Sequence, residues 1–228
     1  MLGCPDHGPG SANMKHSLLL LLAAVAGLAA GKIDPALRGP HGAYVEARSA
    51  TVWGGGCHIN AEIVTQERQA IVGYAFEGGT SEGVELSGVR LVAALEAESP
   101  LSESGPENGV VWVSGPSSEA CAAAVGWALA GLGLEAGSVD VLRGAVDVDH
   151  GALLLSVEGH LQVEGDPVPD AACCTMPEAR WYVPLDGRVG ESRVGMAETC
   201  RLVQAEGLTP WSSTGTNSLQ FGRFGVER

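Results

Sequence analysis

The chain has 228 residues, and its 27 acidic and 13 basic side chains give a formal net charge of −14 at pH 7. Because phosphate binding needs clustered Lys and Arg, and the basic residues here are scattered, we expect no nucleic acid partner. A chain of this length fits one domain or two small ones, and it can bury a core without a metal or disulfide.

Residues 14–31 have the pattern of a cleavable secretory signal. Lys15 and His16 precede an apolar run over residues 18–30, and small residues close the run. The run is shorter than the about 20 residues that span a bilayer, and no cysteine marks a lipoprotein cleavage site. We therefore expect a secreted or periplasmic protein with no stable membrane anchor.

The sequence around this signal suggests four parts. Residues 1–13 contain Pro, Gly and Asp ahead of the signal, and we interpret them as a mis-called start extension, with translation beginning at Met14. Residues 32–43 are polar, contain Pro and Gly, and predict a flexible leader. The sequence pattern changes at Tyr44, where polar and apolar residues begin to alternate, and we expect a single globular domain over 44–228.

Short runs rich in Val, Ile and aromatic residues predict most of that domain to be strands. The first run, 44–53, alternates in polarity and ends at three glycines, which predicts a sharp turn. Further strands are expected at 61–65, 70–76, 89–97, 109–114, 138–147, 152–158, 160–164, 180–185 and 219–225. Residues 99–109 lack an apolar period and predict an exposed loop.

One segment has a helical pattern. Ser117 or Ser118 can cap it, the residues that follow are rich in Ala, and apolar positions recur at helical spacing until Gly133. We expect one main helix over about 117–132, packed on the sheet. The predicted fold class is therefore α+β, a mostly antiparallel sheet with one main helix.

Five cysteines remain once Cys4 is set aside with the leading residues. An exported chain meets an oxidising compartment, so disulfides are permitted. An odd number leaves at least one thiol free, paired outside the chain or bound to a metal. Cys121 lies on the apolar face of the predicted helix, and we interpret it as a small buried hydrophobic residue.

The other cysteines suggest a soft metal site. Cys57 follows the glycine turn and precedes His58, while Cys173 and Cys174 are adjacent and Met176 comes two residues later. A disulfide between adjacent cysteines strains the backbone, so the pair more naturally binds separate partners or one metal. Thiolate, imidazole and thioether suit zinc or copper. We expect Cys57, Cys173 and Cys174 to bind such an ion, with His58 and Met176 nearby.

Two other interpretations stay open. The first is a disulfide-stapled extracytoplasmic domain without metal or catalysis, with two disulfides drawn from Cys57, Cys173, Cys174 and Cys200. The second is a thiol enzyme that uses a free cysteine beside His58, although neighbouring side chains on a strand point to opposite faces. The sequence contains no serine-hydrolase elbow, calcium loop or phosphate loop. We expect a binding protein rather than an enzyme.

One motif near the start of the domain consists of Tyr44, Glu46, Ala47, Arg48, Cys57, Asn60 and Glu62. It resembles the opening of a bacterial family, the domain of unknown function numbered 1326. Similar runs follow at 83–89, through the helix, and in the closing motif at Gly207, Leu208, 211–213, 217–218, Phe221, Gly222 and Phe224. The resemblance covers most of 44–224 and carries no activity with it.

This chain departs from the family pattern at two places. Ala50 stands where members often carry a second cysteine, and Cys173, Cys174 and Thr175 stand where many carry His-His-Cys. The resemblance thus implies that one family cysteine is lost at Ala50 and one at Thr175, and that these two positions face each other in relatives. The turn before Cys57 and the loop at Cys173 would then lie close together. At least one Cα of the vicinal pair is then expected within about 10 Å of the Cys57 Cα. We also expect Trp181 or Tyr182 to lie beside that loop.

Overall fold

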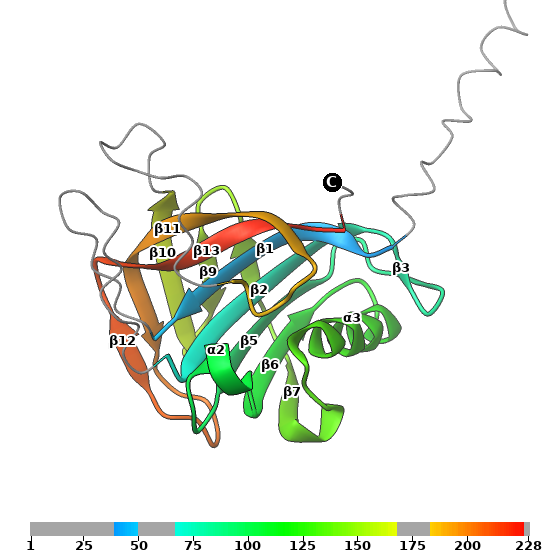
Figure 1. Ribbon diagram of the computed structural model, residues 1–228. Coiled ribbons are helices and arrows are strands. Elements are labelled where there is room, and N and C mark those ends of the chain that lie inside the picture. Colours follow the sequence, from blue (N-terminus) through cyan, green and yellow to red (C-terminus); the bar gives the residue numbers. More distant parts are fainter. Residues whose placement is uncertain (1–38, 50–66, 168–182, 226–228) are drawn as a thin grey trace, which may run out of the picture. The chain divides into compact units, whose positions relative to one another are not determined.

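The computed structural model describes residues 39–49, 67–167 and 183–225 (Figure 1). The chain divides into two units, Met1–Asp34 and Pro35–Arg228, and the described residues belong to the second. The predicted signal, the start extension and most of the leader lie outside the described residues. In the part of the chain that the structure describes, no helix has the length and apolar character needed to cross a membrane.

Strands dominate the described residues, and eleven of them form one sheet. They are β1 His41–Arg48, β2 Gln69–Gly78, β5 Arg90–Glu96, β6 Asn108–Ser114, β7 Val139–Arg143, β8 Asp147–Asp149, β9 Leu154–Val157, β10 Leu161–Pro167, β11 Val189–Leu202, β12 Trp211–Ser213 and β13 Thr216–Phe224. Their order is β7-β6-β5-β2-β1-β13-β11-β10-β9-β8, and β12 pairs with β11. A small hairpin, β3 Thr80–Ser81 with β4 Val84–Glu85, stands apart from the sheet.

The predicted α+β class is wrong, because the chain is mostly β and its curled sheet is mixed. Helix α3, Ser118–Leu132, connects β6 to β7, and these two strands pair in parallel. A helical crossover returns the chain to the same end of the sheet, so the strands it joins run in the same direction. The helix itself was predicted correctly, but its effect on strand direction was not.

Other local features also differ from the expectations drawn from the sequence. Residues 183–185, the described part of the strand predicted at 180–185, are not in a strand. The loop predicted at 99–109 contains a one-turn helix, α2 Leu101–Ser104, because buried Leu101 anchors it. The longest strand, β11, was missed, since its glycines and polar residues mask the alternation. Strand β1 begins at His41, before the expected domain start at 44.

The sheet curls into a half-barrel (Figure 1), and both faces of its central strands are buried. One face of β1, β2, β5 and β6 packs against α3 and forms the helix-side core. The other face packs against residues of β8 to β11 and forms the inner core. Gly73 on β2 permits a close approach of β9, because a Cβ there would lie 2.1 Å from the Leu155 side chain. The central strands are therefore apolar on both sides.

Helix α3 is capped as its sequence predicts. The Ser117 side chain accepts a hydrogen bond from the Ala120 N–H at 3.0 Å, and Gly133 ends the helix in the left-handed conformation. Cys121 is buried in the helix-side core, which confirms its interpretation as a small buried residue. After the helix, the chain passes through the short 3-10 turn η2, Ala136–Ser138, and enters β7.

The cap gives a direct test of this local structure. Ser117→Ala removes the side-chain acceptor from the Ala120 N–H, and we expect it to lower the free energy of unfolding by about 1 kcal/mol. Ser118→Ala changes an exposed serine one residue later and is the matched control. Urea unfolding followed by circular dichroism measures both variants. Equal losses in the two variants would contradict the assigned cap.

Candidate functional site

The residues predicted to bind a metal lie outside the described part of the chain. They are Cys57 and His58 in segment 50–66, and Cys173, Cys174 and Met176 in segment 168–182. Trp181 and Tyr182 also belong to the second segment. The expected approach of Cys57 to the vicinal cysteines therefore stays a prediction.

The described residues that flank the two segments meet at a buried ionic cluster. Arg48 near the end of β1 forms ion pairs with Glu46 of the same strand and with Glu67, which directly follows segment 50–66. Its Nη2 also donates a hydrogen bond to the carbonyl of Val183 at 2.6 Å, directly after segment 168–182. Arg48, Glu46 and Glu67 are fully buried. One guanidinium thus joins chain positions next to both cysteine segments.

Strand alternation explains why these charges share one face. Tyr44, Glu46 and Arg48 are two residues apart on β1 and lie on the helix-side face, while Val45 and Ala47 enter the inner core. The Glu46 carboxylate accepts the Tyr44 hydroxyl hydrogen and also the Leu185 N–H at 2.9 Å. The same face of β1 therefore changes from aromatic at Tyr44 to ionic at Arg48.

A second carboxylate anchors the chain that follows Val183. Asp186 is fully buried and accepts a hydrogen bond from the Tyr74 hydroxyl at 3.0 Å. It also accepts the Arg188 N–H at 2.9 Å and pairs with the Arg188 guanidinium at 2.6 Å. That guanidinium lies 3.4 Å from the centroid of the Trp127 ring on α3. Residues 183–188 are thereby held to both the sheet and the helix.

The two tyrosines serve as hydrogen-bond donors in this cluster. Burial raises the pKa of the Tyr44 phenol well above its ordinary value, and the neighbouring Glu46 carboxylate raises it further. Burial and Asp186 raise the pKa of Tyr74 in the same way. Both hydroxyls therefore stay protonated at neutral pH. The paired carboxylates and guanidinium groups fit a structural role that fixes the chain around them.

The described cysteines, Cys121 and Cys200, are both free and buried. Burial raises the pKa of the Cys200 thiol, so this thiol stays protonated at neutral pH. In the structure Cys200 forms no disulfide, so it takes no part in the pairing considered from the sequence. Only Cys57, Cys173 and Cys174 remain for a staple or for a metal site. Among the described residues, no group of three or more His, Cys, Asp or Glu side chains could hold a metal ion.

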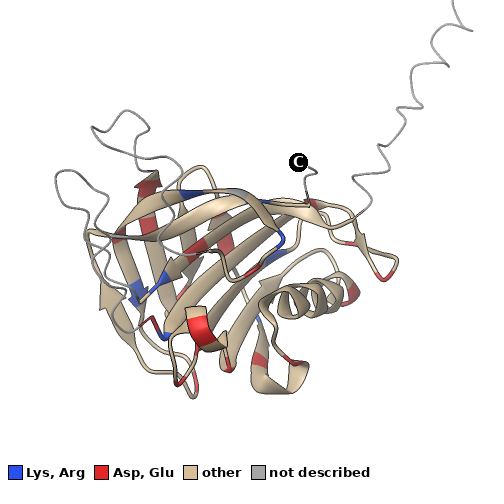
Figure 2. Cartoon of the chain, viewed as in Figure 1, with Lys and Arg blue, Asp and Glu red and all other residues tan. Residues whose placement is uncertain are grey.

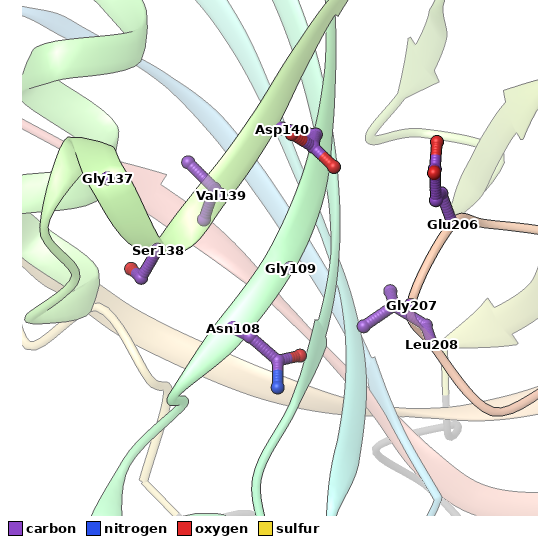
Figure 3. Close-up of a pocket in the computed structure, with 9 residues that line it drawn as sticks. All are labelled: Asn108, Gly109, Gly137, Ser138, Val139, Asp140, Glu206, Gly207 and Leu208. Carbon is purple, nitrogen blue, oxygen red and sulfur yellow. The ribbon is translucent and has the colours of Figure 1, made fainter.

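A separate open pocket of about 310 Å³ lies between β6, β7 and the turn before β12 (Figure 3). Its lining residues are Asn108, Gly109, Gly137, Ser138, Val139, Asp140, Glu206, Gly207 and Leu208. Asp140 and Glu206 are exposed carboxylates, and no lining residue is basic. Sequence reasoning missed this pocket because three distant segments build it and none carries a motif.

The ionic cluster predicts a large effect of one substitution. Arg48→Met leaves the buried carboxylates of Glu46 and Glu67 without their cation, and we expect a loss of about 3–5 kcal/mol in the free energy of unfolding. Arg90→Met removes an exposed arginine from β5 in the same sheet, and we expect it to change stability by under about 0.5 kcal/mol. Urea titration at pH 7 compares them. A loss in Arg48→Met no larger than in the control would show that the buried pairing contributes nothing.

The chain was compared with protein families, curated proteins and solved structures. No protein-family model, no curated protein and no solved structure matches the chain. The resemblance to the family numbered 1326 stays a prediction. The function is therefore inferred from the residues of this chain alone.

Proposed function

We propose that this protein is exported and binds one soft metal ion, copper or zinc, through Cys57, Cys173 and Cys174. His58 and Met176 are the nearest further candidates for ligands in the sequence. Thiolates are strong ligands for both ions, and a thioether favours Cu(I). Export rests on the signal pattern of residues 14–31.

The observation that carries this proposal is the hydrogen-bonded contact between Arg48 and Val183. Cys57 lies nine residues after Arg48, and Cys174 lies nine residues before Val183. One end of each cysteine segment therefore lies at the same place on the sheet, although Cys57 and Cys174 are far apart in sequence. Nine residues reach at most about 30 Å, so this common origin supports, and does not require, a meeting of the thiols.

The burial of the two other cysteines, Cys121 and Cys200, also supports a metal site at the remaining three. Cys121 and Cys200 are buried free thiols, so the exported domain has three cysteines left to share. Three thiolates make a complete set for a trigonal soft-metal site, whereas one disulfide leaves the third thiol unused. The disulfide-stapled domain is the alternative, with one staple in place of the two first considered.

Metal content is the first test. We expect mature protein, purified without chelators or a histidine tag, to contain about one equivalent of copper or zinc by elemental mass spectrometry. The triple variant Cys57→Ser, Cys173→Ser, Cys174→Ser should lose the metal. Cys121→Ala alters a thiol of the helix-side core and should retain it. Equal metal content in the triple variant and in wild type would contradict the proposed ligands.

Counting free thiols distinguishes the proposed metal site from the disulfide-stapled alternative. A metal site leaves all five cysteines of the exported domain reduced, so denatured protein treated with chelator should release five titratable thiols. A single disulfide would leave three. A metal-free protein with three thiols would reject the metal and support the stapled domain.

A further inference from the structure

Strand β7 presents an open edge at one end of the sheet order. It pairs with β6 on one side, and among the described strands none pairs with its other side. Val141 and Leu142 are 48% and 44% exposed, so apolar side chains project from both faces of this edge. Neither a proline nor a register shift interrupts β7. Such an edge is a template for an added strand.

The acidic pocket adjoins this same edge. Val139 and Asp140 of β7 line it, and Figure 3 shows the carboxylates of Asp140 and Glu206 on opposite sides. Asp140 and Leu142 lie on the pocket side of the strand, while Val141 pairs with Val111 on the helix side. The single basic residue of β7 is Arg143, whose Nη1 lies 3.5 Å from the Ser117 carbonyl oxygen next to α3. Arg143 therefore does not neutralise the pocket.

Charge decides what kind of partner fits. Acidic residues outnumber basic residues along the described chain (Figure 2), and the whole chain carries −14. A second copy would bring like charges to the edge, which opposes self-association. A basic segment would instead gain from the two carboxylates, and its approach would be accelerated by the field of the protein.

We propose that the β7 edge binds an extended, basic segment of a partner protein. The segment adds as a strand beside β7 through main-chain hydrogen bonds. Its apolar side chains pack beside Val141 on the helix side. Its alternate side chains point to the pocket side, where one Lys or Arg lies between Asp140 and Glu206.

Two synthetic peptides test this inference on the mature protein. The probe is acetyl-VKVKVK-amide, and the matched control acetyl-VEVEVE-amide has the same apolar positions with opposite charge. We expect only the lysine peptide to bind, with amide shifts in two-dimensional NMR concentrated at residues 139–143 and 206–208. The glutamate peptide should bind at least tenfold more weakly.

Variants then assign the binding to this edge. Asp140→Asn with Glu206→Gln should weaken the lysine peptide about tenfold, whereas Asp147→Asn with Glu158→Gln, which removes two exposed carboxylates elsewhere, should not. Val141→Lys should abolish binding, and Val203→Lys, at a valine 44% exposed outside the edge, should leave it unchanged.

Three results would overturn the proposal. They are the absence of binding by the lysine peptide at millimolar concentration, equal binding of both peptides, and amide shifts that avoid β7. A dimer in light scattering that Val141→Lys dissociates would assign the edge to a second copy instead.

Discussion

The buried guanidinium of Arg48 is the interaction on which the arrangement of this protein depends. A buried arginine is tolerated only when carboxylates and carbonyls satisfy its charge and its donors, and here Glu46, Glu67 and Val183 do so. The ion pair with Glu67 holds the chain against β1 where it leaves segment 50–66. The hydrogen bond to Val183 holds the chain at the same place where it leaves segment 168–182. One side chain therefore sets where both cysteine segments begin or end.

The curled sheet makes this arrangement possible. Because the inner core fills one face and α3 covers part of the other, β1 is buried along its length, and polar residues on it must find partners within the protein. Nearer the helix, buried Asp186 is satisfied in the same way, by a hydrogen bond from Tyr74 and an ion pair with Arg188. The cysteines left over from this framework, Cys57, Cys173 and Cys174, are the ones the proposed metal site uses.

Local signals in the sequence predicted some features and could not predict others. Helix α3 was predictable because its cap, its Ala-rich interior and its terminal glycine agree. Strand β11 was not, because its burial comes from two neighbouring strands rather than from its own pattern. The ionic cluster could have been found, since Tyr44, Glu46 and Arg48 alternate on one strand and so share a face. Its partners Glu67 and Val183 depend on tertiary contacts.

The central claim is that Cys57 and the distant adjacent pair Cys173 and Cys174 share one metal ion, and X-ray absorption at the metal edge tests it most directly. The account predicts about three sulfur neighbours at about 2.3 Å when zinc is bound, and loss of that shell in the triple serine variant. A first shell of nitrogen and oxygen alone would contradict it. So would a sulfur shell that persists when Cys57, Cys173 and Cys174 are all serine.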